Sequence, residues 1–162
     1  MEKETIEESQ ELKEEGAAPT TQASPFVHEE IEHVREGKHG ARSTKQAIAI
    51  GLSKARRAGV KLPTPPRGRV SEETRASAAS ATRRAGRKPN PRRGRAVRAA
   101  LKREGRAAAS PQALSRQARA ASRARGPRAR SASARKAVRT KGAAGRSTAA
   151  EKAARTRKRR GS

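Results

Sequence analysis

The stretch SPFVHEEIEHVREGKHGARSTKQAIAIGLSKARRAGVKLP, residues 24–63, holds most of the capacity of this chain to form a hydrophobic core. Leu, Ile, Val and Phe number sixteen in the 162 residues, and nine of them lie between Phe26 and Leu62. The hundred residues after Leu62 contain only five. Because ordering a residue costs about 1–2 kcal/mol before any burial is counted, we expect only residues 24–62 to fold alone.

Two helices joined by a turn are predicted inside this stretch. The first spans residues 24–36, where Ser24 is the expected N-cap and Pro25 suits the first helical position. The second spans residues 43–58, and its expected N-cap is Ser43, followed three residues later by a glutamine in a capping-box pattern. Each helix ends before a glycine.

Apolar residues recur at helical spacing in both predicted helices. They give each helix one narrow apolar face, and the second helix carries basic residues opposite that face. A hairpin of about forty residues is marginal alone, so oligomerisation or a partner is expected. The predicted hairpin core or partner face consists of Val27, Ile31, Val34, Ile48 and Leu52.

Charge is sorted along the chain. Residues 1–36 contain eleven glutamates and three basic residues, for a net charge of about −8. The other 126 residues contain 38 basic and four acidic residues, for +34, and the two parts sum to the overall +26. Such a polycation is expected to bind polyanions, of which nucleic acids are the most abundant. The acidic segment is expected to moderate that binding as an internal counterion.

The low content of large apolar residues predicts a mostly disordered, otherwise all-α protein. Its predicted parts are an acidic disordered tail (1–23), the helical hairpin (24–62) and a basic low-complexity tail (63–162). The tail repeats Ala/Arg/Ser units that start at capping residues and end at glycines, and we expect these units to become helical only when phosphates neutralise them. The expected starts are Ser71, Asn90, Ser110, Ser131 and Ser147.

The basic residues favour non-specific binding of duplex DNA. The chain has 29 arginines, whose planar guanidinium groups bind phosphate bidentately, against 12 lysines. One aromatic residue is too few for a stacking platform, and the basic segments offer no rigid frame for reading bases. The predicted phosphate contacts are Lys38, Arg42, Lys45, Lys54, Arg56, Arg57, Arg83, Arg84, Arg92, Arg93, Arg157, Lys158, Arg159 and Arg160.

The turn before the second helix can be interpreted as an anion-binding site or as a plain capped turn. Lys38, His39 and Arg42 flank the backbone N–H groups of residues 43–45, an arrangement that suits an anion. A plain capped turn explains the same residues, and the spacing does not match a nucleotide-binding P-loop. Both interpretations stay open at this point.

Catalysis, cofactors and metal ions are not predicted. The chain lacks Cys and Asp, and no serine has an evident partner histidine, so we expect no enzyme activity. The pairs His28 with Glu32 and Glu29 with His33 have i,i+4 spacing, but among so many glutamates they are interpreted as solvated side chains. No signal peptide or membrane span is evident, and we expect a cytoplasmic, nucleoid-associated protein.

Residues 24–63 resemble a family of small basic bacterial proteins of unknown function. Its members share a core similar to HGARSTKQAIAIGLSKARRAGVKLP, here residues 39–63, followed by a variable basic tail. The resemblance implies a bacterial source and no catalytic residue or cofactor. Some members carry the labels plasmid stabilisation or DNA-binding. The tail resembles the arms of linker histones and bacterial histone-like proteins in composition.

These observations predict a DNA-binding protein that compacts or protects a nucleoid or plasmid by neutralising phosphates. Two alternatives stay open. In the first, the hairpin docks a protein partner and the tail is an electrostatic tether. In the second, the chain is an RNA- or ribosome-associated protein, because phosphate charge is common to both nucleic acids.

Overall fold

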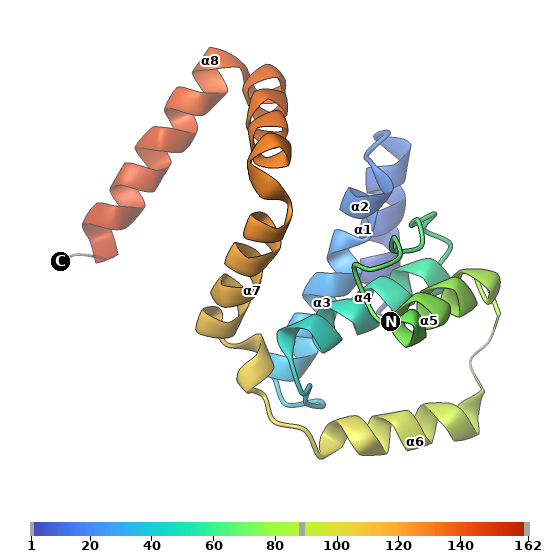
Figure 1. The fold of residues 1–162 in the computed structure, drawn as a ribbon. Helices are drawn as coiled ribbons and strands as arrows, with labels where there is room; N and C mark the ends of the chain where they lie inside the picture. Colours follow the sequence, from blue (N-terminus) through green and yellow to red (C-terminus); the bar gives the residue numbers. More distant parts are fainter. Residues whose placement is uncertain (1, 88–89, 161–162) are drawn as a thin grey trace. The chain divides into compact units, whose positions relative to one another are not determined.

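The computed structural model describes residues 2–87 and 90–160, and these contain helices and no strand (Figure 1). Two compact units are present, residues 1–117 and residues 118–162. The helices of the first unit begin with α1 (Lys3–Glu14), α2 (Pro19–Gln22), α3 (Ser24–Arg35), α4 (Thr44–Arg57), α5 (Glu72–Arg83) and α6 (Pro91–Lys102). They are followed by the 3-10 helix η1 (Ala107–Ala109), by α7 (Pro111–Ala124), which crosses the unit boundary, and by α8 (Gly126–Arg160).

The prediction of a mostly disordered chain is wrong. Most described residues are helical, and the acidic segment forms α1, which packs on α3. Counting only large apolar residues missed the packing that alanine provides. Alanine has the highest helix propensity, and its small side chain lets helices approach closely. Among the residues whose burial the structure describes, eight alanines are buried, namely Ala23, Ala41, Ala47, Ala55, Ala78, Ala81, Ala108 and Ala109.

Helices α3 and α4 form the predicted hairpin and lie side by side, with α1 against α3 and α5 against α4 (Figure 1). The N-cap at Ser43 is confirmed, because its hydroxyl accepts a hydrogen bond from the Gln46 N–H at 3.2 Å. The predicted N-cap at Ser24 is wrong. Ser24 is the first residue of α3, and its hydroxyl instead donates to the Thr21 carbonyl at 2.7 Å.

The end of α4 is closed by a Schellman motif. Gly59 has a φ of 99°, and its N–H donates to the Arg56 carbonyl, while the Val60 N–H donates to the Ala55 carbonyl. This geometry needs a glycine and folds the next apolar residue back on the last turn. Val60 and Leu62 are accordingly buried.

Two small clusters make up the core of the first unit. One joins Ile31 and Val34 of α3 to Ala47 of α4 and to the two buried alanines of η1, with Val27 and Leu114 packed against it. The other surrounds Phe26 with apolar residues of α4 and the chain after it, and Ile6 and Leu52 pack against it. The predicted apolar face is therefore partly covered within the chain, with Ile31 and Val34 buried and Val27, Ile48 and Leu52 half-buried.

The segment around η1 is held against both hairpin helices by polar contacts. Thr44 donates its hydroxyl to the Ala108 carbonyl at 2.6 Å, and Arg35 Nε donates to the Ala109 carbonyl at 3.1 Å. The turn joins the same segment, because the N–H groups of residues 40 and 41 donate to the carbonyls of residues 101 and 105. These long-range contacts order a part of the chain that the sequence indicated as a tail.

Three of the five helix starts predicted after residue 63 are observed. Ser71, Asn90 and Ser110 each accept a hydrogen bond from the N–H three residues later and precede a helix. Ser131 and Ser147 do not start helices, because both lie inside α8. Helix α8 is instead interrupted at Gly142, whose φ of 63° is not helical.

Candidate functional site

Exposed cations gather at the turn between α3 and α4. Arg42 and Lys45 are exposed at the start of α4. The hydrogen bonds from the turn to residues 101 and 105 bring this pair near the basic end of α6. Arg106 belongs to the same neighbourhood, since its Nη1 donates to the Arg35 carbonyl at 3.4 Å. Sequence reasoning missed this grouping because the contacts span about sixty residues.

A second basic group lies where α4 and α5 end. The Gly86 N–H donates to the Arg57 carbonyl at 3.0 Å, which joins the two helix ends. Arg57, Arg83 and Arg84 are all exposed there. The repeated string RRAG, at residues 56–59 and 83–86, thus meets itself in the structure. Three of the predicted phosphate contacts are brought together in this way.

Helix α6 carries the clearest basic face of the first unit. Its twelve residues contain five cations and no acidic residue, and all but Leu101 are exposed. At 100° per residue, four of the cations fall within an arc of about 120°, along a row about 15 Å long. The α6 basic face consists of Arg92, Arg95, Arg98 and Lys102. Arg93, a predicted contact, points to the other side of the helix by the same spacing.

Two predicted phosphate contacts are turned inward. The Lys54 ammonium lies 2.8 Å from Glu29 Oε1 and 2.8 Å from Glu30 Oε2. Arg56 is 5% exposed, and its guanidinium donates to the carbonyls of Leu52 and Pro63, while its Nε–H donates to no partner among the described residues. Both side chains therefore serve the fold rather than the surface.

The remaining predicted contacts lie at the surface or outside the described side chains. Lys38 is exposed at the turn and forms ion pairs with Glu36 at 3.0 Å and Glu2 at 3.3 Å. Arg157 and Lys158 are exposed near the end of α8. The side chains of Arg159 and Arg160 lie outside the part that the structure describes.

Capping explains most of the turn that was considered as an anion site. Gln46 Oε1 accepts a hydrogen bond from the Arg42 N–H at 2.7 Å, and the Gln46 N–H donates to the Ser43 hydroxyl. This reciprocal arrangement is a capping box, and it satisfies the N–H groups of the residues on either side of 43–45 rather than those of 43–45 themselves. The capped turn is therefore observed, and the Arg42 and Lys45 side chains are exposed beside it.

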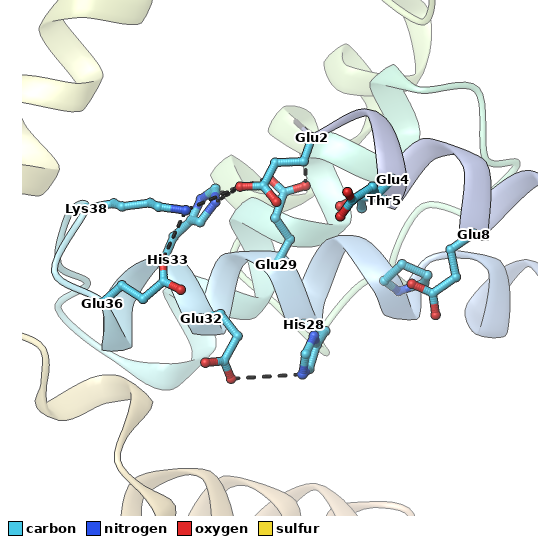
Figure 2. A pocket seen from close by; sticks show the side chains of 11 residues that line it. Glu2, Glu4, Thr5, Glu8, His28, Glu29, Glu32, His33, Glu36 and Lys38 are labelled. Carbon is cyan, nitrogen blue, oxygen red and sulfur yellow. Dashed lines mark hydrogen bonds and ion pairs between the residues drawn. The ribbon is translucent and has the colours of Figure 1, made fainter.

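An acidic pocket lies between α1 and α3 (Figure 2). Six glutamates line it, and Lys38 is the one lysine or arginine among the lining residues. Glu2 holds one edge, because its carboxylate lies 3.0 Å from His33 Nε2 and its N–H donates to Glu29 Oε2. The pKa of Glu2 is lowered by the hydrogen bonds from His33 and Lys38.

Glu29, which lines this pocket, forms an ion cluster with Glu30 and Lys54 that joins α3 to α4. Burial by itself raises the pKa of Glu29, but hydrogen bonds from Lys54, Thr5 and the Glu2 N–H lower it to about 2. Burial lowers the pKa of Lys54, and its bonds to the two glutamates outweigh this and raise it. Glu29 therefore stays ionised in mildly acidic solution, and Lys54 stays charged in mildly basic solution.

Residues 28–66, about a quarter of the chain, match DUF6496, a family of unknown function. The matched part runs from the second turn of α3 through α4 and the segment after it. No curated protein and no solved structure matches the chain. Within residues 2–87 and 90–160, no helix has both the length and the apolar character needed to cross a bilayer.

Proposed function

We propose that this protein binds nucleic acid through its exposed basic helices, without sequence preference, and compacts or protects duplex DNA. The observation that supports this best is the α6 basic face, four exposed cations on a helix that contains no acidic residue. Packing does not require these side chains, and like charges three or four residues apart destabilise a helix. Phosphates would relieve that repulsion.

Helix α8 extends the same chemistry in the second unit. Arg128, Arg135 and Arg139 are exposed and recur at i, i+7 and i+11, which places them on one face. If about ten phosphates are neutralised in all, the slope of log K against log salt is about −9. Binding should then weaken by several decades between low and moderate salt.

The acidic pocket gives the first unit a face that repels phosphates. Nucleic acid should therefore approach from the basic helices, and the acidic segment reduces affinity at a given salt concentration. Replacing the exposed Glu4 and Glu8 by Gln should tighten binding, whereas unchanged affinity would remove the moderating role. Deleting all of residues 1–23 is a poorer test, because Ile6 packs on the Phe26 cluster.

The test of the proposal is a salt titration of the full chain. Fluorescence anisotropy measures its affinity for a duplex, for a shuffled duplex and for a structured RNA as sodium chloride is raised. A quadruple variant replaces the four cations of the α6 basic face by Gln, and a matched variant replaces its three arginines by Lys. We expect the Gln variant to lose about three to four units of salt slope and the Lys variant to keep it.

Two results would remove the proposal. One is the absence of binding to any of the three probes in dilute buffer, and the other is affinity that does not change over a tenfold rise in salt. A clear preference for the structured RNA would favour the RNA- or ribosome-associated role instead. Sequencing the nucleic acid that co-purifies after nuclease-free lysis checks the same choice in cells. A bacterial source and a plasmid-related role, which the resemblance of residues 24–63 implies, are likewise part of what we propose.

A further inference from the structure

Three side chains with metal-binding atoms meet where the turn folds back on α3. Glu30 and His33 are one turn apart on α3, and His39 comes from the turn that follows the helix. One ligand atom from each lies within 4.8 Å of the others. Glu30 is fully buried, and the side chains of His33 and His39 are 14% and 12% exposed. The sequence analysis considered two histidine–glutamate pairs and missed this group of three, because only the turn brings His39 to α3.

The tautomer of His39 leaves two electron pairs facing each other. His39 Nδ1 lies 3.0 Å from the Gly40 carbonyl oxygen, which only accepts, so Nδ1 carries the hydrogen. In the neutral ring, Nε2 then presents a lone pair to Glu30 Oε1 at 3.3 Å. Two acceptors at this distance repel unless a cation lies between them or the ring is protonated.

The buried charge around Glu30 is also incompletely balanced. Apart from the ion pair of Lys54 with Oε2, neither carboxylate oxygen of Glu30 has a hydrogen-bond partner among the described residues, although both are buried. Lys54 lies 2.8 Å from Oε2, but it also serves Glu29, so one ammonium faces two carboxylates. A buried charge without full compensation is costly. Oε1 is the oxygen that remains for another cation.

His33 is oriented as a ligand by a neighbouring carboxylate. Its Nε2 lies 3.0 Å from Glu2 Oε1 and donates to it, which leaves the lone pair on Nδ1. A carboxylate on the second ring nitrogen is the usual support of a metal-binding histidine. The Gly40 carbonyl plays the same part for His39.

We propose that Glu30 Oε1, His33 Nδ1 and His39 Nε2 bind a divalent transition-metal ion, best matched by Zn²⁺, with a fourth position open to water. Two imidazoles and one carboxylate are a common zinc ligand set. Tetrahedral bonds of about 2.0–2.1 Å place ligand atoms about 3.3 Å apart, which the distance from His39 to Glu30 already meets. The metal links α3 to the turn that precedes α4 and leaves Lys54 on Oε2. This site is independent of nucleic-acid binding.

The test uses the full chain, freed of metal by chelation, and Zn²⁺ as the probe. Isothermal titration calorimetry should show one ion per chain, and Co²⁺ should give the visible absorption of a four-coordinate complex. His33→Ala and His39→Ala should each weaken zinc binding by at least about tenfold. His28→Ala is the matched control, because His28 lies on the same helix with its side chain 79% exposed and should leave binding unchanged.

A measurement on the unaltered chain covers the case in which a variant fails to fold. The chain has three histidines, so their ring resonances can be assigned by NMR. Zinc should shift the resonances of His33 and His39 and leave those of His28 in place. Absence of zinc binding, equal affinity in all three variants, or a shift at His28 alone would each overturn the proposal. The first of these outcomes would leave a protonated His39 as the partner of Glu30.

Discussion

Replacing Gly51 by Ala tests the close approach of α3 and α4. Gly51 lies in the middle of α4 and faces α3. A Cβ there would lie 2.7 Å from Val27 Cα and 2.8 Å from the Phe26 carbonyl oxygen. Both neighbours are backbone atoms, which no rotamer change can move aside. Reaching an ordinary contact of 3.4 Å requires the helices to separate by about 0.7 Å.

The magnitude follows from two opposing effects. Overpacking a close-packed interior costs about 1–3 kcal/mol. Against this, alanine is better than glycine inside a helix by about 0.5–1 kcal/mol. We therefore expect Gly51→Ala to lower the free energy of unfolding by about 1–2 kcal/mol. The sign is the informative part, since helix propensity alone predicts the opposite.

Gly94→Ala provides the matched control. Gly94 lies inside α6 with a helical backbone, and a Cβ there would meet nothing within 4 Å. Only propensity acts, so this variant should gain about 0.5–1 kcal/mol or increase helix content. Urea unfolding followed by circular dichroism at pH 7 measures both variants. If Gly51→Ala stabilised the protein as Gly94→Ala does, α3 and α4 would not approach as described, and the reasoning would fail.

Three further predictions concern the buried ion cluster and the turn. Lys54→Met should lower the free energy of unfolding in urea by about 3–5 kcal/mol, because it leaves two carboxylates buried without their ammonium. Lys45 is exposed, so Lys45→Met should change that free energy by less than about 0.5 kcal/mol. Equal losses in the two variants would contradict the pairing of Lys54 with the glutamates. The pKa of Glu29 falls from 4.5 to about 2, so its contribution of about 3 kcal/mol is complete above about pH 4.5 and is lost as the pH falls toward 2. Glu29→Gln should make the urea midpoint of unfolding less dependent on pH in this acidic range. The same pH dependence as in the unaltered chain would exclude Glu29 as its source. Gly40→Ala would place a Cβ against the Glu104 carbonyl and should speed trypsin cleavage in residues 101–106, whereas Gly105→Ala, with open space around it, should cleave like the unaltered chain.

The hairpin was predictable because its signals are local. Ser43 and Gly59 mark the two ends of α4 within a turn of the residues they cap, and the structure confirms both. Ser24 failed as a cap because α2 precedes α3 almost without a break, so the serine lies inside the continuing helical path. Capping residues in the sequence predict the start of a helix reliably where a loop precedes the helix, and less reliably where another helix precedes it.

The extent of order was not predictable from counts of large apolar residues. Ala108 and Ala109 close the cluster around Ile31 and Val34 from a segment more than seventy residues away. Alanine carries little hydrophobic surface, so composition gave it no weight. Its contribution arises only when small residues allow helices to meet closely, and that is a property of pairs of segments.

Part of the candidate site was equally hidden. Lys54 and Arg56 lie beside exposed basic residues in sequence, and a helical wheel places Lys54 near the boundary of the apolar arc and Arg56 on the side that carries the basic residues. The sequence did contain one signal that Lys54 is turned inward, namely the adjacent Glu29 and Glu30 on the facing helix. Two neighbouring glutamates at a helix interface need a cation from the partner helix, and Lys54 supplies it.

The cations of this chain thus divide into two kinds with different reasons to be present. Lys54 and Arg56 are required by the fold, because carboxylates or carbonyls inside the first unit bind them. The fold does not require the α6 basic face, and four like charges on one face of a helix oppose helix formation. Solubility needs a net charge of only about 2–8 in a small domain, far below the +34 of residues 37–162. This cost supports the proposal that a ligand outside the chain binds these cations, and a row of phosphates is the ligand that we propose for them.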